Sequence, residues 1–169
     1  MCFLIHYTFF HPNVIVKGMG NPLCMALVYR SLRCMKLLIK AGADVNCKGC
    51  AMTPLLFATW RGGYTNYIQF LLKAGADPNI PDDLGRLPIE FAAVRDCKEE
   101  VEMLFPLTSP IPNVRNWSIE GVISYAKIEE KKPMVCYFLF LCCFRTEYCL
   151  KGKPLIGSSA LNLFTKCYY

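Results

Sequence analysis

The stretch LLIKAGADVN at residues 37–46 returns almost unchanged as LLKAGADPN at residues 71–79. In both copies leucines and a lysine lead into Ala-Gly-Ala-Asp-x-Asn, and the first alanines of the two words, Ala41 and Ala74, stand 33 positions apart. Two nearly identical words at this distance indicate a structural unit of that length that occurs more than once.

A second landmark repeats with nearly the same period. Pro22, Pro54 and Pro88 each open a short apolar run, and they are separated by 32 and 34 residues. A spacing that varies slightly around a fixed value indicates a repeated supersecondary unit with small loop insertions. The middle of the chain is therefore predicted to hold three copies of one unit.

The first part of each unit predicts a short helix. Proline is favoured at the first helical position, where its missing N–H leaves no hydrogen bond unmade, and Asn21 or Thr53 before it can cap the free amides. The helix then carries apolar and small residues on one face, which lets a second helix approach closely. These residues are Leu23 and Ala26, Leu55 and Ala58, and Ile89 and Ala92.

The second part of each unit predicts another helix, whose apolar residues recur at i, i+3 and i+4. Gly42 and Gly75 end this helix, because glycine accepts the left-handed φ found at helix ends. Asp44 and Asp77 follow in the turn, where short acceptors satisfy nearby backbone amides. The apolar stripes are Cys34, Met35 and Leu37 to Ile39, then Ile68 and Phe70 to Leu72, then Val101 and Met103 to Phe105.

These residues resemble ankyrin repeats, whose consensus begins with Thr-Pro-Leu-His and ends with Gly-Ala-Asp-x-Asn. The resemblance covers roughly residues 18–105. It implies an all-α ankyrin-repeat solenoid of about three helix-loop-helix units, with a following helix and irregular termini. The chain departs from the consensus at the threonine, replaced by Asn21 and Leu87, and at the histidine, replaced by Cys24, Leu56 and Glu90.

The domain boundaries follow from this register. The repeats are expected at 18–109, in units of about 18–46, 47–79 and 80–109. The third unit has no Gly-Ala-Asp word, and Pro106, Pro110 and Pro112 end its helical pattern. Outside the repeats lie an apolar N-terminal extension at 1–17, a Pro-rich junction with a capping or linker helix at 110–130, and an unmatched basic tail rich in cysteines and aromatic residues at 131–169.

The junction also has a familiar wording. LFPLTSPIPNVRNWSIEGVISYAKIEE at 104–130 resembles the segment that joins ankyrin repeats to a tetratricopeptide-repeat domain in certain plant proteins. The signature of that second domain does not follow in 131–169, so peptide binding by such a domain is not carried over. Within the junction, one amphipathic helix is expected over 117–130, with Asn116 or Ser118 as its cap.

Composition and charge exclude several classes. The chain has 169 residues, of which 54% are apolar and 19% charged, as in a globular domain. The net charge is +6, but residues 18–130 hold twelve Lys and Arg against twelve Asp and Glu, so the excess lies in Lys17 and the tail. A nucleic-acid reader would be expected to cluster basic residues on its folded face. Nucleic acid is therefore not expected as a partner.

The cysteines predict an intracellular protein. There are eleven, an odd number spread over the whole chain, which favours reduced thiols over a disulfide framework. The apolar start lacks the basic residues of a signal peptide. The run MVCYFLFLCCF at 134–144 is too short to cross a bilayer as a helix. We expect a cytoplasmic location, with the nucleus also compatible.

The inventory of chemical groups is small. Cys47-x-x-Cys50 is the one pattern that suits a metal or redox chemistry, but zinc needs four ligands and no second pair exists. His6 and His11 are the only histidines, and neither stands in a catalytic motif. We therefore expect no catalytic residue, no metal, no cofactor and no enzymatic activity.

The resemblance implies protein–protein binding instead. An unidentified partner protein would bind the concave ankyrin surface of a monomeric adaptor. Trp60 has an equally good interpretation as an internal packing residue, and Asp82 and Asp83 are expected at a solvated loop tip. Two alternatives remain: a regulator tethered to a membrane through the apolar tail at 134–149, which is less favoured, or a truncated variant without independent activity. The expected partner-binding residues are Lys48, Trp60, Arg61, Asp82, Asp83, Leu84 and Arg86.

Overall fold

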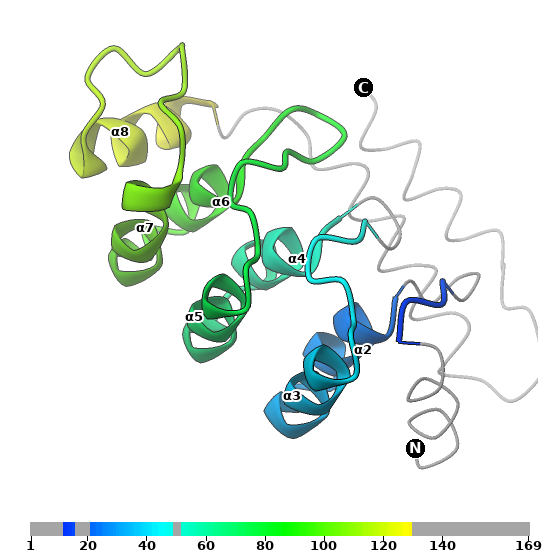
Figure 1. Ribbon diagram of the computed structural model, residues 1–169. Helices are drawn as coiled ribbons and strands as arrows, with labels where there is room; N and C mark the ends of the chain where they lie inside the picture. The colour runs from blue at the N-terminus through cyan, green and yellow to red at the C-terminus, as the bar shows by residue number, and fades with distance from the viewer. Residues whose placement is uncertain (1–11, 16–20, 49–51, 130–169) are drawn as a thin grey trace, which may run out of the picture. The chain divides into compact units, whose positions relative to one another are not determined.

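The computed structural model describes residues 12–15, 21–48 and 52–129 (Figure 1). The chain divides into two compact units, Met1–Pro133 and Met134–Tyr169, and every described residue belongs to the first. The expected tail at 131–169 and most of the extension at 1–17 lie outside the described residues, as do Cys50 and both histidines.

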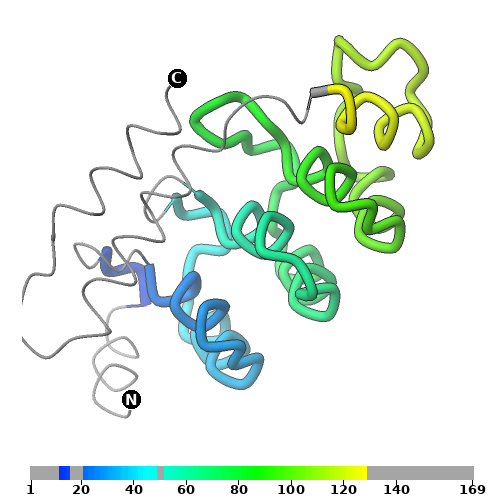
Figure 2. The backbone as a smooth tube through the Cα atoms, turned by 180° about the vertical axis from the view of Figure 1, so that it is seen from behind, coloured from blue at the N-terminus to red at the C-terminus, as the bar shows by residue number. Residues whose placement is uncertain are grey.

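The described part of the chain is helical and contains no strand. Its helices come in antiparallel pairs, followed by a single longer helix (Figures 1 and 2). In chain order they are α2 (Pro22–Val28), α3 (Leu32–Lys40), α4 (Pro54–Arg61), α5 (Thr65–Lys73), α6 (Pro88–Val94), α7 (Lys98–Leu104), the 3₁₀ turn η1 (Phe105–Leu107) and α8 (Ile119–Glu129).

The pairs stack in sequence order, which is the solenoid that the repeat predicts. The first helices form one row, in which α4 packs against both α2 and α6, and the second helices form another, in which α5 packs against α7. Ala58 and Ala92 are completely buried in the first row, where their small side chains allow helix axes to approach. The core between the rows is formed by Leu23, Leu27, Met35, Leu55, Leu56, Ile68, Leu71, Ile89, Val101 and Leu104.

The predicted helix starts are confirmed. The side chain of Asn21 accepts a hydrogen bond from the amide of Cys24 at 2.6 Å, and Thr53 Oγ1 accepts one from Leu56 at 3.2 Å. In the third unit Leu87 has no acceptor to offer. Glu90 forms the other half of a capping box, because its Oε2 accepts from the Leu87 amide at 2.6 Å. The residue in the histidine position thus satisfies the amide of the N-cap residue, while the side-chain cap of the threonine position is lost.

The Gly-Ala-Asp words form the predicted turns. Gly42 and Gly75 hold φ of 90° and 91°, which only glycine adopts without strain. Asp44 and Asp77 each accept a hydrogen bond at 2.8 Å from the amide two residues on. The same turn geometry therefore recurs in the first and second units for the same local reasons.

One asparagine in each turn links neighbouring units. Asn46 donates to the carbonyl of Gly75 at 3.2 Å and accepts from the amide of Asp77 at 2.8 Å. Asn79 repeats this pattern with Leu107 and Ser109. Asn13 makes the equivalent pair of bonds to Gly42 at 3.1 Å and Asp44 at 2.6 Å. Asn13, which lies within the apolar extension expected at 1–17, thus makes the first pair of hydrogen bonds in this asparagine ladder.

The final helix, α8, begins two residues later than expected, at Ile119. Ser118 caps it, since its Oγ accepts from the amide of Gly121 at 3.0 Å. α8 packs against α6 and α7, and buries Val122 and Ala126 there. It covers the face of α6 that a further repeat would otherwise cover.

Candidate functional site

The residues expected to bind a partner fall into two groups at opposite ends of the first-row helices. Lys48, Asp82, Asp83, Leu84 and Arg86 lie in the loops that lead into α4 and α6, and we call this group the loop surface. Trp60 and Arg61 lie at the other end of α4, which spans eight residues. At about 1.5 Å per residue, the two groups are separated by roughly 12 Å along the helix axis.

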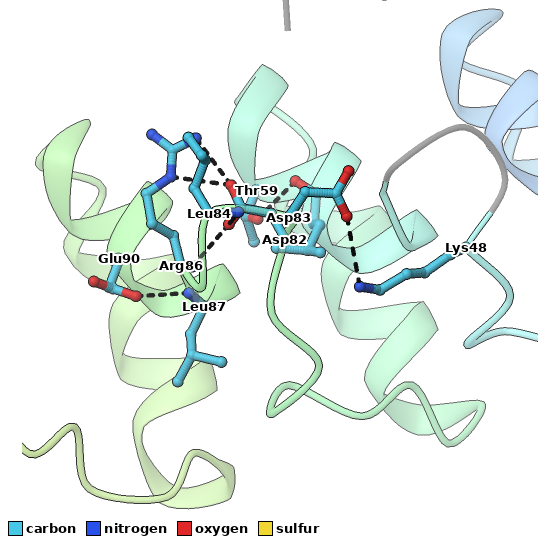
Figure 3. Close-up of polar contacts among 9 residues, drawn as sticks. Lys48, Thr59, Asp82, Asp83, Leu84, Arg86, Leu87 and Glu90 are labelled. Carbon is cyan, nitrogen blue, oxygen red and sulfur yellow. Dashed lines mark hydrogen bonds and ion pairs between the residues drawn. The ribbon is translucent and has the colours of Figure 1, made fainter. Parts of the chain in front are cut away.

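Asp82 organises the loop surface from within. This residue is only 6% exposed, so the solvated position expected for it is wrong. One carboxylate oxygen accepts from the amides of Leu84 at 2.9 Å and Arg86 at 2.7 Å, and the other meets Nε and Nη2 of Arg86 at 3.0 and 2.9 Å (Figure 3). The Arg86 guanidinium also lies over the ring of Phe91, 4.9 Å from its centre. Asp82 and Arg86 therefore fix the shape of this loop.

The outward-facing part of the loop surface is smaller than the expected set. Asp83, Leu84 and Lys48 are exposed, and Leu84 presents 53% of its surface to solvent. Lys48 Nζ and Asp83 Oδ1 are 4.0 Å apart, so two successive loops face each other across an exposed ion pair (Figure 3). Such a pair contributes only about 0–1 kcal/mol, which leaves both groups available to a partner.

The residues at the end of α4 have mixed roles. Trp60 is half-buried, and its ring is 6.0 Å from that of the buried Phe57, so it packs within its own helix as well as reaching the surface. Arg61 is exposed. A Trp60→Ala variant would therefore disturb packing together with any binding.

Two arginines that the sequence analysis did not single out lie beside Arg61. Arg30 Nη2 donates to the carbonyl of Gly63 at 3.0 Å, and its guanidinium lies 4.6 Å from the centre of the Tyr64 ring. Arg95 Nη1 donates to the carbonyl of Thr59 at 2.8 Å. A sequence signal existed, because Arg30, Arg61 and Arg95 are separated by 31 and 34 residues, close to the repeat period.

A buried carboxyl group lies under Arg95. Glu100 is 0% exposed, its Oε1 accepts from Thr65 Oγ1 at 3.1 Å, and its Oε2 lies 3.9 Å from Arg95 Nη1 without a hydrogen bond among the described residues. Burial raises the pKa of Glu100 above its ordinary value, and the Thr65 hydrogen bond and Arg95 charge offset this only in part. Burial likewise raises the pKa of the Cys97 thiol, which favours the protonated form of this half-buried cysteine.

The described residues contain no group of three His, Cys, Asp or Glu side chains placed to hold a metal ion. Cys47 is a half-buried free thiol. No helix within these residues has the length and apolar character needed to cross a membrane. The apolar run at 134–149 lies outside the described part of the chain.

The helices of this structure come in pairs, asparagines link the turns, and the Gly-Ala-Asp geometry recurs. Comparison of the sequence with known protein families agrees with this arrangement. The family model described as "Ankyrin repeats (3 copies)" matches residues 3–82 and 23–116. The chain belongs to the ankyrin-repeat family. The first match begins at residue 3, which agrees with the place of Asn13 in the ladder.

Curated ankyrin-repeat relatives have diverse names. Protein phosphatase 1 regulatory subunit 27 of Homo sapiens is 38% identical over 79 residues, which is 46% of this chain and 50% of the relative. Palmitoyltransferase AKR1 of Kluyveromyces lactis is 45% identical over 62 residues, 36% of this chain and 8% of the relative. A putative ankyrin repeat protein of Rickettsia felis is 30% identical over 92 residues, 54% of this chain and 30% of the relative. The match thus spans at most half the length of each, and the family indicates a protein-interaction module.

Proposed function

We propose that this chain is a non-catalytic adaptor that holds a partner protein on its loop surface, through Lys48, Asp83 and Leu84. The observation that carries the proposal is the internal bonding of the loop that bears two of these residues: the buried Asp82 ties it to Arg86, which leaves Asp83 and Leu84 exposed.

A preformed loop favours binding because little conformational entropy is lost when the partner arrives. The Asp82 bonds hold the loop closed, and the asparagine ladder links its base to the next unit. Leu84 supplies apolar area beside an exposed pair of opposite charges, Lys48 and Asp83. This combination suits a protein surface with an apolar residue flanked by polar groups.

One of the relatives supports a regulatory role. It is named a regulatory subunit of a protein phosphatase, and this chain matches half of its length. We infer that this chain likewise positions one protein for another, as a monomer in the cytoplasm or nucleus. The same comparison names no partner for this chain.

Leucine variants of matched exposure test the proposal. Leu84 on the loop surface is 53% exposed, and Leu107 in η1 is 51% exposed. Tagged full-length wild type, Leu84→Ala and Leu107→Ala would be used to capture partners from cell extract, and the captured proteins quantified by mass spectrometry. We expect Leu84→Ala, and separately Asp83→Lys, to lose a protein that wild type and Leu107→Ala retain, with each variant's unfolding free energy within about 0.5–1 kcal/mol of wild type. Identical captured sets for all four proteins would overturn the proposal.

A further inference from the structure

Arginines from three successive repeats meet at one turn of the solenoid. We call this region the turn edge; it comprises the turns at 29–31, 61–64 and 95–97, at the end of the first-row helices away from the loop surface. Arg30 reaches it from the first unit, Arg61 belongs to it, and Arg95 reaches it from the third unit. All three are exposed.

Two consecutive glycines make room for this convergence. A methyl group on Gly62 would lie 1.5 Å from Arg95 Nη2, and one on Gly63 would lie 3.2 Å from Arg30 Nη2. Since consecutive Cα atoms are about 3.8 Å apart, the two guanidinium groups are held within roughly 10 Å of each other. Arg61 directly precedes Gly62, so a third positive charge adjoins the pair.

Contacts within the protein orient these arginine side chains but use only some of their hydrogen-bond donors. Arg30 is fixed by the Gly63 carbonyl and the Tyr64 ring, and Arg95 by the Thr59 carbonyl. A guanidinium has five N–H donors, so most donors on each group remain for a ligand. Within the described part of the chain, the Arg61 side chain forms no hydrogen bond or ion pair, and it is exposed. Tyr29, 44% exposed, adds an aromatic surface beside Arg30.

Acidic residues near the turn edge do not cover it. Asp96 is engaged with Lys127, whose Nζ lies 3.0 Å from its carboxylate. Glu100 is fully buried beneath Arg95 and presents nothing to the surface. Glu99 is exposed near the start of α7 and adds one negative charge beside the edge. The three exposed arginines outnumber these acidic groups, so the exposed charge of this edge is positive, although residues 18–130 as a whole are neutral.

We propose that the turn edge binds an acidic stretch of a partner protein, whose carboxylate or phosphate oxygens are held by Arg30, Arg61 and Arg95. Guanidinium groups bind both kinds of oxygen through paired N–H donors, and their prior orientation reduces the entropy lost on binding. In an extended peptide, residues i and i+2 point the same way at roughly 7 Å, a spacing that suits two of these arginines. The inference rests on the proposed protein-binding function and assigns it a second surface and a charged class of partner.

The test uses the full-length protein and fluorescent peptides, measured by anisotropy. The probes are a poly-glutamate peptide, a phosphoserine-containing peptide and an uncharged poly-glutamine peptide of equal length. Measurements at about 0.05 M salt keep electrostatic attraction strong, and a second series at about 0.15 M salt reports its screening. The variants are Arg61→Glu and, as a matched control, Arg115→Glu, which changes the same net charge at an exposed position outside the turn edge.

We expect at least one anionic peptide to bind, the poly-glutamine peptide not to bind, and Arg61→Glu to weaken binding at least about tenfold while Arg115→Glu changes it less than about twofold. The anionic peptide that binds more tightly shows whether the turn edge prefers carboxylate or phosphate oxygens. A double Arg30→Lys, Arg95→Lys variant keeps the charge but loses paired donors, and we expect it to weaken the preferred peptide as well.

Three results would overturn the inference: no anionic peptide binds wild type, Arg115→Glu weakens binding as much as Arg61→Glu, or phosphatidylserine vesicles or a DNA duplex bind tighter than either peptide. Thermal unfolding of each variant separates lost binding from lost folding. Failure of the adaptor proposal would be a different result: the Leu84→Ala variant would capture the same proteins as wild type. Leu84 does not belong to the turn edge, so the two proposals can fail separately.

Discussion

Replacing the buried Glu100 with glutamine is expected to stabilise the protein, and to do so in a pH-dependent way. The wild-type carboxyl is fully buried, with one oxygen bonded to Thr65 and the other 3.9 Å from Arg95 Nη1. Its pKa is raised in the folded state, so folding favours the protonated form. The isosteric Glu100→Gln side chain keeps an acceptor for Thr65 but never carries a charge.

The sign follows from proton linkage. Below the pKa of an exposed glutamate, about 4.3, the carboxyl is protonated in both the folded and the unfolded states, and burial of charge costs nothing. As the pH rises from there to the raised folded pKa, wild type loses stability, and above that value the loss is complete. Glu100→Gln has no such loss, so its advantage over wild type grows across this interval and is then constant.

The size of the stability gain of Glu100→Gln is set by two opposing contributions. Each unit by which the pKa is raised corresponds to about 1.4 kcal/mol at neutral pH. The positive charge of Arg95 lowers the cost of burying the Glu100 carboxylate. It does not remove this cost, because Arg95 Nη1 is 3.9 Å from Glu100 Oε2 and the Arg95 side chain is partly exposed to solvent. From the usual cost of burying a polar group whose hydrogen bonding is incomplete, we expect a gain in unfolding free energy of about 1–3 kcal/mol at pH 7.

Urea unfolding of full-length wild type and Glu100→Gln between about pH 4 and pH 8, followed by circular dichroism, measures this difference. Glu102→Gln on the same helix is the control, because Glu102 is exposed and forms only a surface pair with Lys98 at 3.8 Å. We expect the control to stay within about 0.5 kcal/mol of wild type. A Glu100→Gln variant that is less stable than wild type at pH 7 would show that the Arg95 ion pair outweighs the cost of burial, and would refute the reasoning.

Further perturbations follow from the same contacts, each measured by urea unfolding. Asp82→Ala should cost about 3–5 kcal/mol, since it leaves the Arg86 charge without its buried partner, while Asp83→Ala should stay within about 0.5 kcal/mol. Gly62→Ala should cost about 1–3 kcal/mol, because φ is 70° and Arg95 occupies the methyl position; an added Arg95→Ala that recovers none of this loss would contradict the steric part. Thr53→Ala should cost about 1 kcal/mol through the lost cap, and a neutral result would argue against it.

The units and their helices were predictable from sequence because their causes are local. Pro54 with Thr53 before it starts a helix, and Gly75 ends one, through interactions that span only a few residues. α8 was predicted from its amphipathic pattern, but its first residue was not. Gly121 lies so close to the carbonyl of Asn116 that a methyl group would be 1.9 Å from it, a contact that no helical pattern reports.

The candidate sites were predicted less well, because the burial of a side chain depends on how its loop closes and on which unit packs against it. Asp82 and Asp83 look alike in the sequence, yet one is buried by the loop that closes around it and the other is exposed. Asn13 was assigned to an extension because no Gly-Ala-Asp word accompanies it, and its role depends on two hydrogen bonds to the next unit.

By itself the sequence determined the period, the helix boundaries within a few residues, and the family, since caps, prolines and glycines act within one turn of chain. Only the tertiary structure, through the closure of loops and the stacking of the units, decided which polar residues were buried and which were exposed. It buried Glu100 against Thr65 and brought Arg30 and Arg95 to the same pair of glycines. These contacts join residues about one repeat apart in sequence, and they form because each unit must cover the apolar face of its neighbour.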